Sequence, residues 1–353
     1  MRALVVVTRY LGDVLLATPL ARALTAAGYE VEWLVAPGTE AMVTNQPFAA
    51  AVHTLTPSMR GMRETVVSLY QQFDIACVIT GSDRATAVSR LVAKRVFALL
   101  PIRWQDGWKR HLVTRWVTHD SHSHMVSYNH DLCRLVGAAM PATDVSLEWC
   151  SADDATVQQQ LGWEASARFV HLHPFARWRY KLWPAEKWQQ LIAKLHGAGL
   201  RTVITAGPTE AEQAQALAAN SALDDDAIRV LAGTLSWAQL AALSARAALY
   251  VGLDTANTHL AAGSGTAVVA LYGPSDPRIW GPWPKGWQGG RSPYQTHNER
   301  GVQKVGSVTL IQPVVGCIPC QREGCAHHRE SSSSCLTQLA LSTVWQQCEE
   351  ALA

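Results

Sequence analysis

Residues 251–277 read VGLDTANTHLAAGSGTAVVALYGPSDP, and this stretch decides the fold. An apolar run that enters it (247–253) and another near its end (267–272) predict two buried strands. Between them lies a helix of small residues, with Asp254 or Thr255 as its N-cap. Strand, helix and strand with short connections form the unit of a parallel sheet, so the stretch predicts an α/β protein.

The start of this predicted helix is a candidate anion site. Its first N–H groups lack intrahelical partners and the positive end of the helix dipole lies there, so it favours a phosphate. His259 lies about one turn into the helix, where its ring can face the same anion. An ordinary βαβ core does not require Asp254, Thr255 and His259 together, so this polar cluster favours a ligand site.

Length and composition limit the class of protein. At 353 residues the chain is too long for one typical core, which predicts two domains. A net charge of +2 argues against a nucleic-acid partner. No apolar run approaches the ~20 residues of a membrane span, and the start of the chain continues as a strand and helix instead of a signal peptide. We therefore expect a cytoplasmic protein, in which the eight cysteines are thiols or metal ligands.

The N-terminal segment predicts a second candidate site. Residues 3–7 form a buried strand, and helical spacing of leucines begins at Val14. Gly12 permits a tight turn, and Asp13 then lies at the start of the helix, above the strand, where α/β sheets place their chemistry. Asp13 is either an N-cap, worth about 1 kcal/mol, or a catalytic base. Pro19 is expected to kink the helix.

The rest of the first half continues the α/β pattern. Predicted strands are 31–35, 51–55 and 75–80, and predicted helices are 59–73, 85–93 and 127–135. Residues 104–115 predict a basic, tryptophan-bearing loop. Basic side chains of this half are a candidate patch for an anionic acceptor, although each alone is more often a surface charge. They are Arg60, Arg63, Arg84, Lys109, Arg110 and Arg115.

A change of composition over 141–154 predicts a linker to a second α/β series. Its predicted strands are 169–172, 202–205 and 227–231, and its helices are 185–196, 210–219 and a terminal helix over 340–352. Lys181 is a candidate phosphate ligand, or else a surface lysine. Glu210 or Glu212 follows a strand and is a candidate for holding ribose hydroxyls.

Four cysteines form a cluster in the tail. Cys317, Cys320, Cys325 and Cys335 have the spacing C-x2-C-x4-C-x9-C. The close pair is suggestive of zinc, but the outer spacing fits no standard finger. We therefore expect no metal, with a structural metal at these four cysteines as the alternative.

Four motifs resemble those of bacterial ADP-heptose:lipopolysaccharide heptosyltransferases, glycosyltransferase family 9. They are RYLGDVLLATPL at 9–20, KLWP at 181–184, DTANTHLAA at 254–262 and YGPSDP at 272–277. The resemblance covers nearly all of the chain. The run HPFARWRYKLWP and the tail CIPCQREGC look most like heptosyltransferase III, the branch that adds a side heptose to the inner core.

The resemblance implies a GT-B fold, with two Rossmann-like doubly wound α/β domains and an inter-domain cleft. Residues 1–150 would bind the acceptor, residues 151–339 with the Cys-rich tail the nucleotide sugar, and the helix 340–353 would pack back across the cleft. The implied activity is an inverting transfer of heptose from ADP-heptose to a heptose of the lipid A-linked lipopolysaccharide inner core. It implies no required cofactor, and peripheral contact with the cytoplasmic face of the inner membrane.

Site residues follow from the matching positions. The resemblance implies that Asp13 acts as general base on the acceptor hydroxyl and that Lys181 stabilises the departing ADP. Implied donor-binding residues are Arg177, Lys181, Gly207, Glu210, Glu212, Leu235, Asp254, Thr255, Ala256 and His259. Implied acceptor-binding residues are Gly12, Arg60, Arg63, Arg84, Lys109 and Arg110. Ala256 departs from the glycine of some relatives, and residues 175–177 depart from the threonines of heptosyltransferase I.

Other interpretations remain open at this point. The chain fits the heptosyltransferase I or II step, or a non-catalytic protein of the same fold that binds a nucleotide sugar or the core. Asp13 and Lys181 are both present, which favours an enzyme. A dehydrogenase is less favoured, because the sequence after the first strand lacks the GxGxxG fingerprint.

Overall fold

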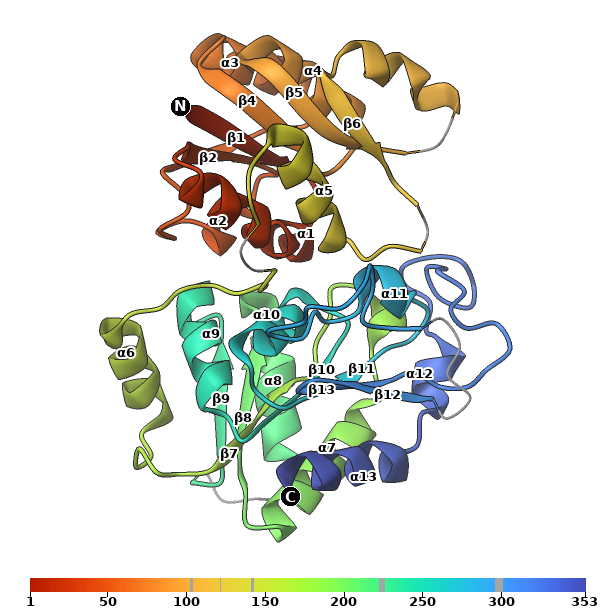
Figure 1. The fold of residues 1–353 in the computed structure, drawn as a ribbon. Coiled ribbons are helices and arrows are strands. Elements are labelled where there is room, and N and C mark those ends of the chain that lie inside the picture. The colour runs from red at the N-terminus through yellow and green to blue at the C-terminus, as the bar shows by residue number, and fades with distance from the viewer. Residues whose placement is uncertain (102–103, 121, 141–142, 222–225, 296–300) are drawn as a thin grey trace. The chain divides into compact units, whose positions relative to one another are not determined.

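The computed structural model describes residues 1–101, 104–120, 122–140, 143–221, 226–295 and 301–353. The chain divides into two compact units, each built on its own sheet (Figure 1). The first unit comprises Met1–Val145 and Gln288–Ser292, and the second comprises Ser146–Trp287 and Pro293–Ala353.

The described residues of the first unit form a six-stranded sheet of order β3-β2-β1-β4-β5-β6, in which each neighbouring pair is parallel. Its strands are β1 (Arg2–Val7), β2 (Glu30–Val35), β3 (Ala51–Thr54), β4 (Phe73–Val78), β5 (Ala93–Leu100) and β6 (Arg115–Thr118). Helices α2 (Thr18–Ala26) and α5 (Ser127–Val136) cover one face, and α3 (Met59–Leu69) and α4 (Asp83–Val92) cover the other (Figure 1).

Burial on both faces explains the continuous apolar runs of these strands. Leu4 and Val6 of β1 and Val78 of β4 pack with Val88 and Val92 of α4, while the intervening strand residues face the opposite helices. Each of these side chains is at most 1% exposed, which makes the centre of the sheet a rigid base for the loops at its edge.

The described residues of the second unit form a seven-stranded sheet of order β12-β13-β11-β10-β7-β8-β9. Its strands are β7 (Phe169–His173), β8 (Arg201–Ala206), β9 (Ile228–Ala232), β10 (Leu249–Leu253), β11 (Val268–Leu271), β12 (Val302–Val305) and β13 (Val308–Ile311). Neighbouring strands are parallel apart from β12, which runs antiparallel to β13.

Helices cover both faces of this second sheet (Figure 1). One face carries α7 (Ala185–Gly197), α8 (Ala211–Ala219) and α13 (Leu341–Leu352), and the other carries α6 (Ser151–Leu161), α9 (Trp237–Arg246) and α10 (Ala256–Ser264). Within β7, Val170 and Leu172 pack with the first group and Phe169 with the second. This alternation is that of a doubly wound sheet.

Short helices complete the chain. They are α1 (Leu11–Leu16), α11 (Pro277–Trp280), α12 (Ser334–Gln338) and the 3₁₀ turns η1 (Glu40–Met42), η2 (Trp104–His111), η3 (Arg179–Lys181) and η4 (Pro208–Glu210).

The strand–helix–strand unit predicted around residues 251–277 is confirmed as β10, α10 and β11, with Thr255 as the N-cap. The N-terminal helix differs from its prediction. It divides into α1 and α2 at Ala17, and Pro19 lies in the first turn of α2, where its missing N–H costs nothing. The helix over 59–73 is wrong at its end, because Gln71 has a left-handed φ of 53° and Phe73 begins β4.

Strands β5, β6, β12 and β13 and helix α6 are absent from the sequence predictions. Strand β5 starts at Ala93 directly after α4, with no glycine or proline to separate them. The predicted linker 141–154 begins with two residues outside the described ones, and its last four belong to α6. The units divide at Val145–Ser146.

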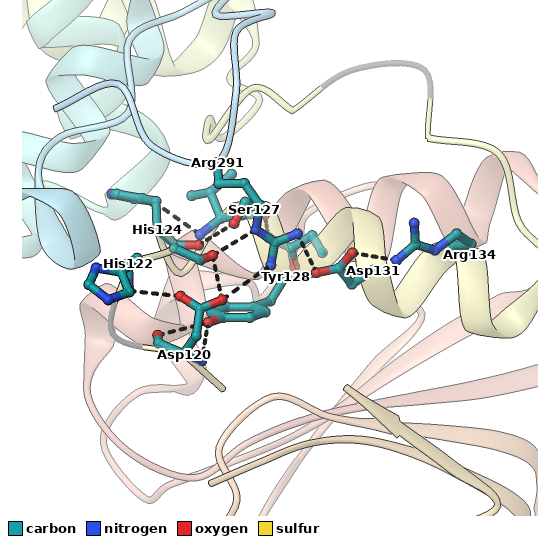
Figure 2. A network of polar contacts seen from close by, with 11 residues as sticks. Asp120, His122, His124, Ser127, Tyr128, Asp131, Arg134 and Arg291 are labelled. Atoms are coloured by element: carbon teal, nitrogen blue, oxygen red, sulfur yellow. Dashed lines mark hydrogen bonds and ion pairs between the residues drawn. The ribbon is translucent and has the colours of Figure 1, made fainter. Parts of the chain in front are cut away.

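A short segment of the later chain belongs to the first unit. Residues 288–292 group with it, although the chain on both sides groups with the second unit. Figure 2 shows Arg291 of this segment among polar residues of α5 and the loop before it. Its guanidinium donates to Ser123 Oγ at 2.7 Å and pairs with Asp131 Oδ2 at 2.8 Å, and it lies 5.4 Å from the Tyr128 ring centre. His124 N–H donates to the Arg291 carbonyl at 2.9 Å, so both backbone and side chain anchor the segment.

Candidate active site

Each sheet has a position where its strand order reverses. In the first sheet the chain runs outward from β1 to β3 and returns to β4, on the other side of β1. In the second it runs outward from β7 to β9 and returns to β10, beside β7. Ligands of open α/β sheets bind outside the carboxyl ends of the strands at such positions. The residues that follow β1, β4, β7 and β10 are therefore the candidates for chemistry.

Asp13 follows β1 as the third residue of α1, and it is 7% exposed. Its Oδ2 accepts a hydrogen bond from the Tyr10 backbone N–H at 3.1 Å. This bond fixes the carboxylate in the first helical turn, where the dipole favours a negative charge. A Cβ on Gly12 would meet no described atom within 4 Å, so the backbone beside Asp13 is unobstructed. Asp13 thus combines a capping bond with a place at the reversal point.

Hydroxyl groups join the loops on the two sides of this reversal point. Thr8 N–H, after β1, donates to Thr80 Oγ1 at 3.2 Å, and Thr8 Oγ1 lies 3.3 Å from Ser82 Oγ. Ser82 Oγ also accepts from Ala85 N–H at 3.1 Å and so caps α4. The sequence offered no motif for this set, because its members meet only when β1 and β4 pair.

The predicted basic patch is only partly at the surface. Arg60, Arg63, Arg84 and Arg110 are exposed, and Arg60 pairs with Glu64 at 2.7 Å. Lys109 is a correction to the prediction. It is 3% exposed, pairs with Asp83 at 2.7 Å and with Asp106, and donates to the Gly81 carbonyl at 2.6 Å. Its charge is neutralised inside the fold.

In the second unit, two residues separate the end of β10 from the start of α10, at the reversal point. The first N–H groups of a helix have no carbonyl partner within it. Within the described chain, the Thr255 side chain caps none of them. Two buried side-chain atoms of the first turn, Asn257 Oδ1 and His259 Nδ1, also have no hydrogen-bond partner among the described residues. Unused hydrogen-bonding groups of this kind, gathered at one helix terminus, indicate a binding site.

Lys181 and Asp254 form an ion pair across the reversal point, the first from the loop after β7 and the second from the end of β10. Lys181 Nζ lies 2.6 Å from Asp254 Oδ2 and donates to the Asp254 carbonyl at 3.3 Å. Ser275, after β11, donates to the same Oδ2. Burial raises the pKa of Asp254, but Lys181 and Ser275 together bring it below its ordinary value. Asp254 is therefore ionised and holds the lysine beside the first turn of α10.

His259 lies in the same turn and is 4% exposed. Burial lowers its pKa to about 4, an effect that nearby Asp254 opposes and Lys181 reinforces. The ring is therefore neutral near pH 7, so it can offer one donor and one acceptor but no charge. The positive charge at this site comes from Lys181 and the helix terminus.

The other predicted donor-binding residues lie after β7, β8 and β9. Gly207 and Glu210 share one loop, and a Cβ on Gly207 would lie 2.5 Å from Glu210 Oε2, so the glutamate covers this glycine. Glu212 is exposed, and Leu235 packs beside the core under α9. Arg177 is exposed with its guanidinium 4.7 Å from the Trp178 ring centre. Parallel strands place all of these loops at one edge of the sheet.

The cysteines of the tail are free thiols. Ser334 N–H donates to Cys325 Sγ at 3.3 Å, and Cys325 Sγ–H donates to Ser334 Oγ at 3.5 Å. Hydrogen bonding with Ser334 lowers the pKa of Cys325. Burial raises the pKa of Cys335 to about 11. Across the described residues, no group of three or more histidine, cysteine, aspartate or glutamate side chains has an arrangement that holds a metal ion.

Two side chains of this site were not singled out from the sequence, although both lie in the quoted motifs. Ser275 belongs to YGPSDP and bonds Asp254, and Asn257 belongs to DTANTH and lies in the first turn of α10. The available signal for both residues was a polar side chain at a position where it has no capping role. The sequence does not show the partner: Ser275 and Asp254, for example, follow different strands and meet only when the sheet forms.

Comparisons with known proteins agree with this geometry. The family model of glycosyltransferase family 9 (heptosyltransferase) matches residues 63–307. Lipopolysaccharide heptosyltransferase 3 of Escherichia coli (strain K12) is 25% identical over 82% of this chain and 89% of its own length. Lipopolysaccharide heptosyltransferase 1 of the same strain is 28% identical over 83% and 94%. The structure of E. coli heptosyltransferase WaaC with ADP matches with a TM-score of 0.70 at 21% identity, over 99% of this chain and 100% of that one.

No helix within the described residues is long and apolar enough to cross a membrane. The predicted GT-B fold is confirmed by the structural match to a heptosyltransferase, which covers 99% of this chain with a TM-score of 0.70. The family match spans more than half of the chain. The chain therefore belongs to glycosyltransferase family 9, the heptosyltransferases, and is a glycosyltransferase.

Proposed function

We propose that this enzyme transfers a heptose from ADP-heptose to a heptose of the lipid A-linked lipopolysaccharide inner core, with inversion at the anomeric carbon. The observation that carries the proposal is the Lys181–Asp254 pair beside the uncapped first turn of α10. A cation and free backbone N–H groups at one point suit a diphosphate that gains charge as it leaves. The ADP of the WaaC structure supports an ADP-linked donor.

The reaction is a single displacement. The acceptor hydroxyl oxygen bonds to the anomeric carbon while the bond from that carbon to the ADP oxygen breaks, which inverts the carbon. Asp13 takes the hydroxyl proton, and ADP leaves with the bonding electron pair. Lys181 and the backbone N–H groups of Thr255 and Ala256 stabilise the charge on ADP, and neutral His259 lies beside the diphosphate. These side chains supply the chemistry without a metal or cofactor.

The nucleoside part of the donor would occupy the loops after β8 and β9. Glu210 or Glu212 would accept hydrogen bonds from ribose hydroxyls, and Leu235 would contact adenine. Gly207 would leave room for the Glu210 carboxylate, and Arg177 would contact the diphosphate. The hydrogen bond from Gly233 N–H to the Ala206 carbonyl, at 2.9 Å, joins the starts of these two loops and supports a shared pocket for the nucleoside.

The acceptor would bind to the first unit. Exposed Arg60, Arg63, Arg84 and Arg110 would contact a phosphorylated inner core, and Gly12 would leave room for the acceptor heptose beside Asp13. These residues follow β1, β3, β4 and β5, whose carboxyl ends share one edge. We propose that the enzyme works at the cytoplasmic face of the inner membrane, in peripheral contact with the lipid that carries its acceptor.

The step that we propose is that of heptosyltransferase III. The motif resemblance and the similarity to heptosyltransferase 3 over 82% of the chain support it. The similarity to heptosyltransferase 1 is of the same order, so the steps of heptosyltransferases I and II are the alternatives.

Release of ADP tests the function and the step together. Purified enzyme would be mixed with ADP-heptose and inner cores that carry no heptose, one heptose or two. Release only with the two-heptose core is expected for the third step. Release with a shorter core would assign an earlier step, and binding of ADP-heptose without release on any core would contradict the proposed activity.

A further inference from the structure

A chain of polar side chains, four buried and the last half-buried, leads from α9 through two strands to the first turn of α10. His171 of β7 lies 3.1 Å from Ser244 Oγ through Nδ1 and 2.7 Å from Thr205 Oγ1 through Nε2. His173 Nδ1 lies 3.0 Å from the same Thr205 oxygen, and His173 Nε2 lies 3.1 Å from Asn257 Nδ2. We call Ser244, His171, Thr205, His173 and Asn257 the relay. The proposed transfer mechanism uses none of these side chains.

Both relay imidazoles are neutral at physiological pH. Burial lowers the pKa of His171 to about 3, reinforced by His173, and that of His173 to about 4. Each neutral ring has one N–H and one acceptor nitrogen. The Asn257 amide nitrogen can only donate, so His173 Nε2 accepts and His173 Nδ1–H donates to Thr205 Oγ1. The relay therefore fixes the His173 tautomer and holds the amide group of Asn257 in one orientation.

In this orientation Asn257 presents its oxygen as an unused acceptor. Asn257 Oδ1 is buried and has no hydrogen-bond partner in the described part of the chain. A buried acceptor left without a partner costs about 1–3 kcal/mol. Thr205 Oγ1–H donates to the Leu172 carbonyl at 3.4 Å, so the Thr205 oxygen accepts from His173 Nδ1–H and leaves His173 Nε2 as an acceptor. A rotated amide would place its oxygen against that acceptor, so the relay maintains this cost. Such unsatisfied groups are characteristic of sites that a ligand completes.

The chemistry of the oxygen selects the ligand group. Phosphate oxygens accept hydrogen bonds at neutral pH, so they suit the N–H groups of this helical turn but not the Asn257 oxygen. A hydroxyl group can donate to it. Asn257 lies two residues beyond Thr255 and three beyond Asp254, so a hydroxyl on either side of a bound diphosphate is the nearest candidate.

We propose that Asn257 Oδ1 accepts a hydrogen bond from a hydroxyl of the nucleotide-sugar donor, and that His173, Thr205 and His171 are positioning residues for Asn257. The inference rests on the proposed function, because it assumes an ADP-sugar at α10. The hydroxyl belongs to the transferred heptose or to the ribose, and the two sources differ in whether ADP alone makes the contact.

Calorimetry with ADP and with ADP-heptose tests the contact. Asn257→Ala is expected to weaken ADP-heptose binding about tenfold, the loss of one hydrogen bond. Unchanged ADP affinity assigns the hydroxyl to the heptose, and an equal loss for ADP assigns it to the ribose. Unchanged affinity for both ligands overturns the inference alone. Wild-type protein that binds neither overturns the proposed function, and this inference with it.

Thr202 provides a matched control on β8, the strand that carries Thr205 of the relay. Thr205 and Thr202 are each 1% exposed on β8, but Thr202 Oγ1 has no partner among the described residues. Thr205→Val is expected to raise the KM for ADP-heptose in the same direction as Asn257→Ala, whereas Thr202→Val leaves it unchanged. The double variant Thr205→Val with Asn257→Ala is expected to lose no more affinity than Asn257→Ala alone. Fully additive losses would make Thr205 merely structural and overturn the positioning assignment.

Discussion

Lys181 Nζ lies 2.6 Å from Asp254 Oδ2, although 73 residues separate the two in sequence. The pair joins the loop after β7 to the end of β10, which are the two strands at the reversal point. The lysine side chain is 22% exposed and that of the aspartate 9%. Asp254 is thus the more deeply buried partner, and it holds a cation where substrate can still reach it.

Removal of the Lys181 charge tests its assignment to the leaving group. Lys181→Ala is expected to lower kcat for ADP release roughly 10²–10³-fold, as for the loss of one group that stabilises transition-state charge. Asp254→Asn is expected to cost less, because it frees the lysine without removing it. Lys194→Ala is the matched control, since Lys194 of α7 lies over the Trp345 ring at 5.3 Å and is outside the site. A wild-type kcat in Lys181→Ala would remove the assignment.

Asp13 has a structural counterpart that separates capping from catalysis. Asp153 accepts from Cys150 N–H at 3.0 Å at the start of α6, as Asp13 accepts from Tyr10 N–H at 3.1 Å at the start of α1. Each substitution to alanine is expected to lower the free energy of unfolding by about 1 kcal/mol. Only Asp13→Ala should also reduce turnover, by at least ~10²-fold, the usual weight of a general base. Equal turnover in the two variants would leave Asp13 as a cap alone.

Salt dependence tests the acceptor patch. Arg60, Arg63, Arg84 and Arg110 are exposed, so phosphate contacts to them should weaken as salt screens the charges. The KM for the acceptor is expected to rise between about 50 mM and 300 mM salt, and Arg84→Ala should lessen that rise. The KM for ADP-heptose serves as the internal comparison. A KM for the acceptor that does not change with salt concentration would argue against a phosphate-binding patch.

The sequence predicted the strand–helix–strand unit around Asp254 well, because Thr255, Gly265 and Pro274 mark its boundaries. It did not predict β5, because α4 passes into that strand at Ala93 with no turn residue. Local signals therefore define an element only where capping or turn residues separate it from the next element. Strand order, and with it the reversal points, depends on pairings that no local signal carries.

The candidate site shows the same difference between what local sequence signals predict and what depends on strand pairing. Asp13, Lys181 and His259 could be selected from their positions after predicted strands or within a predicted helix. Lys109 looked like a surface cation, but Asp83 and Asp106 neutralise it once the chain folds. The relay was not predictable, because His171 and Thr205 meet only through the pairing of β7 with β8. Partners distant in sequence decide whether a polar residue has a structural role or is available to bind a substrate.

Three histidines of the second unit give a pH dependence of stability. Burial lowers the pKa of His171 to about 3 and those of His173 and His259 to about 4, against about 6.5 in the unfolded chain. Between pH 6.5 and 4 the unfolded chain binds protons that the folded chain does not, so the free energy of unfolding falls as pH falls. Asp254 adds its effect only at lower pH, because Lys181 and Ser275 hold its pKa below the ordinary value of an aspartate.

Urea denaturation between pH 7 and pH 5 measures this effect. Each histidine contributes up to about 1.4 kcal/mol per pH unit, so the three together give a slope of roughly 4 kcal/mol per unit near pH 5. His259→Asn is expected to reduce the slope by about a third. A free energy of unfolding that stays constant over this range would contradict the neutral, buried state of these rings.

Arg291 is expected to stabilise the first unit through Asp131. The Asp131 side chain is 5% exposed and pairs with Arg291 at 2.8 Å and with Arg134, itself 79% exposed, at 2.8 Å (Figure 2). Arg291→Ala should lower the free energy of unfolding by about 1–2 kcal/mol, because it leaves a buried carboxylate with only an exposed partner. Arg134→Ala, the matched control, should cost under about 0.5 kcal/mol. Hydrogen exchange should rise at His124, whose N–H bonds the Arg291 carbonyl. Equal costs for the two variants would show that the Arg291 side chain adds no stability through Asp131.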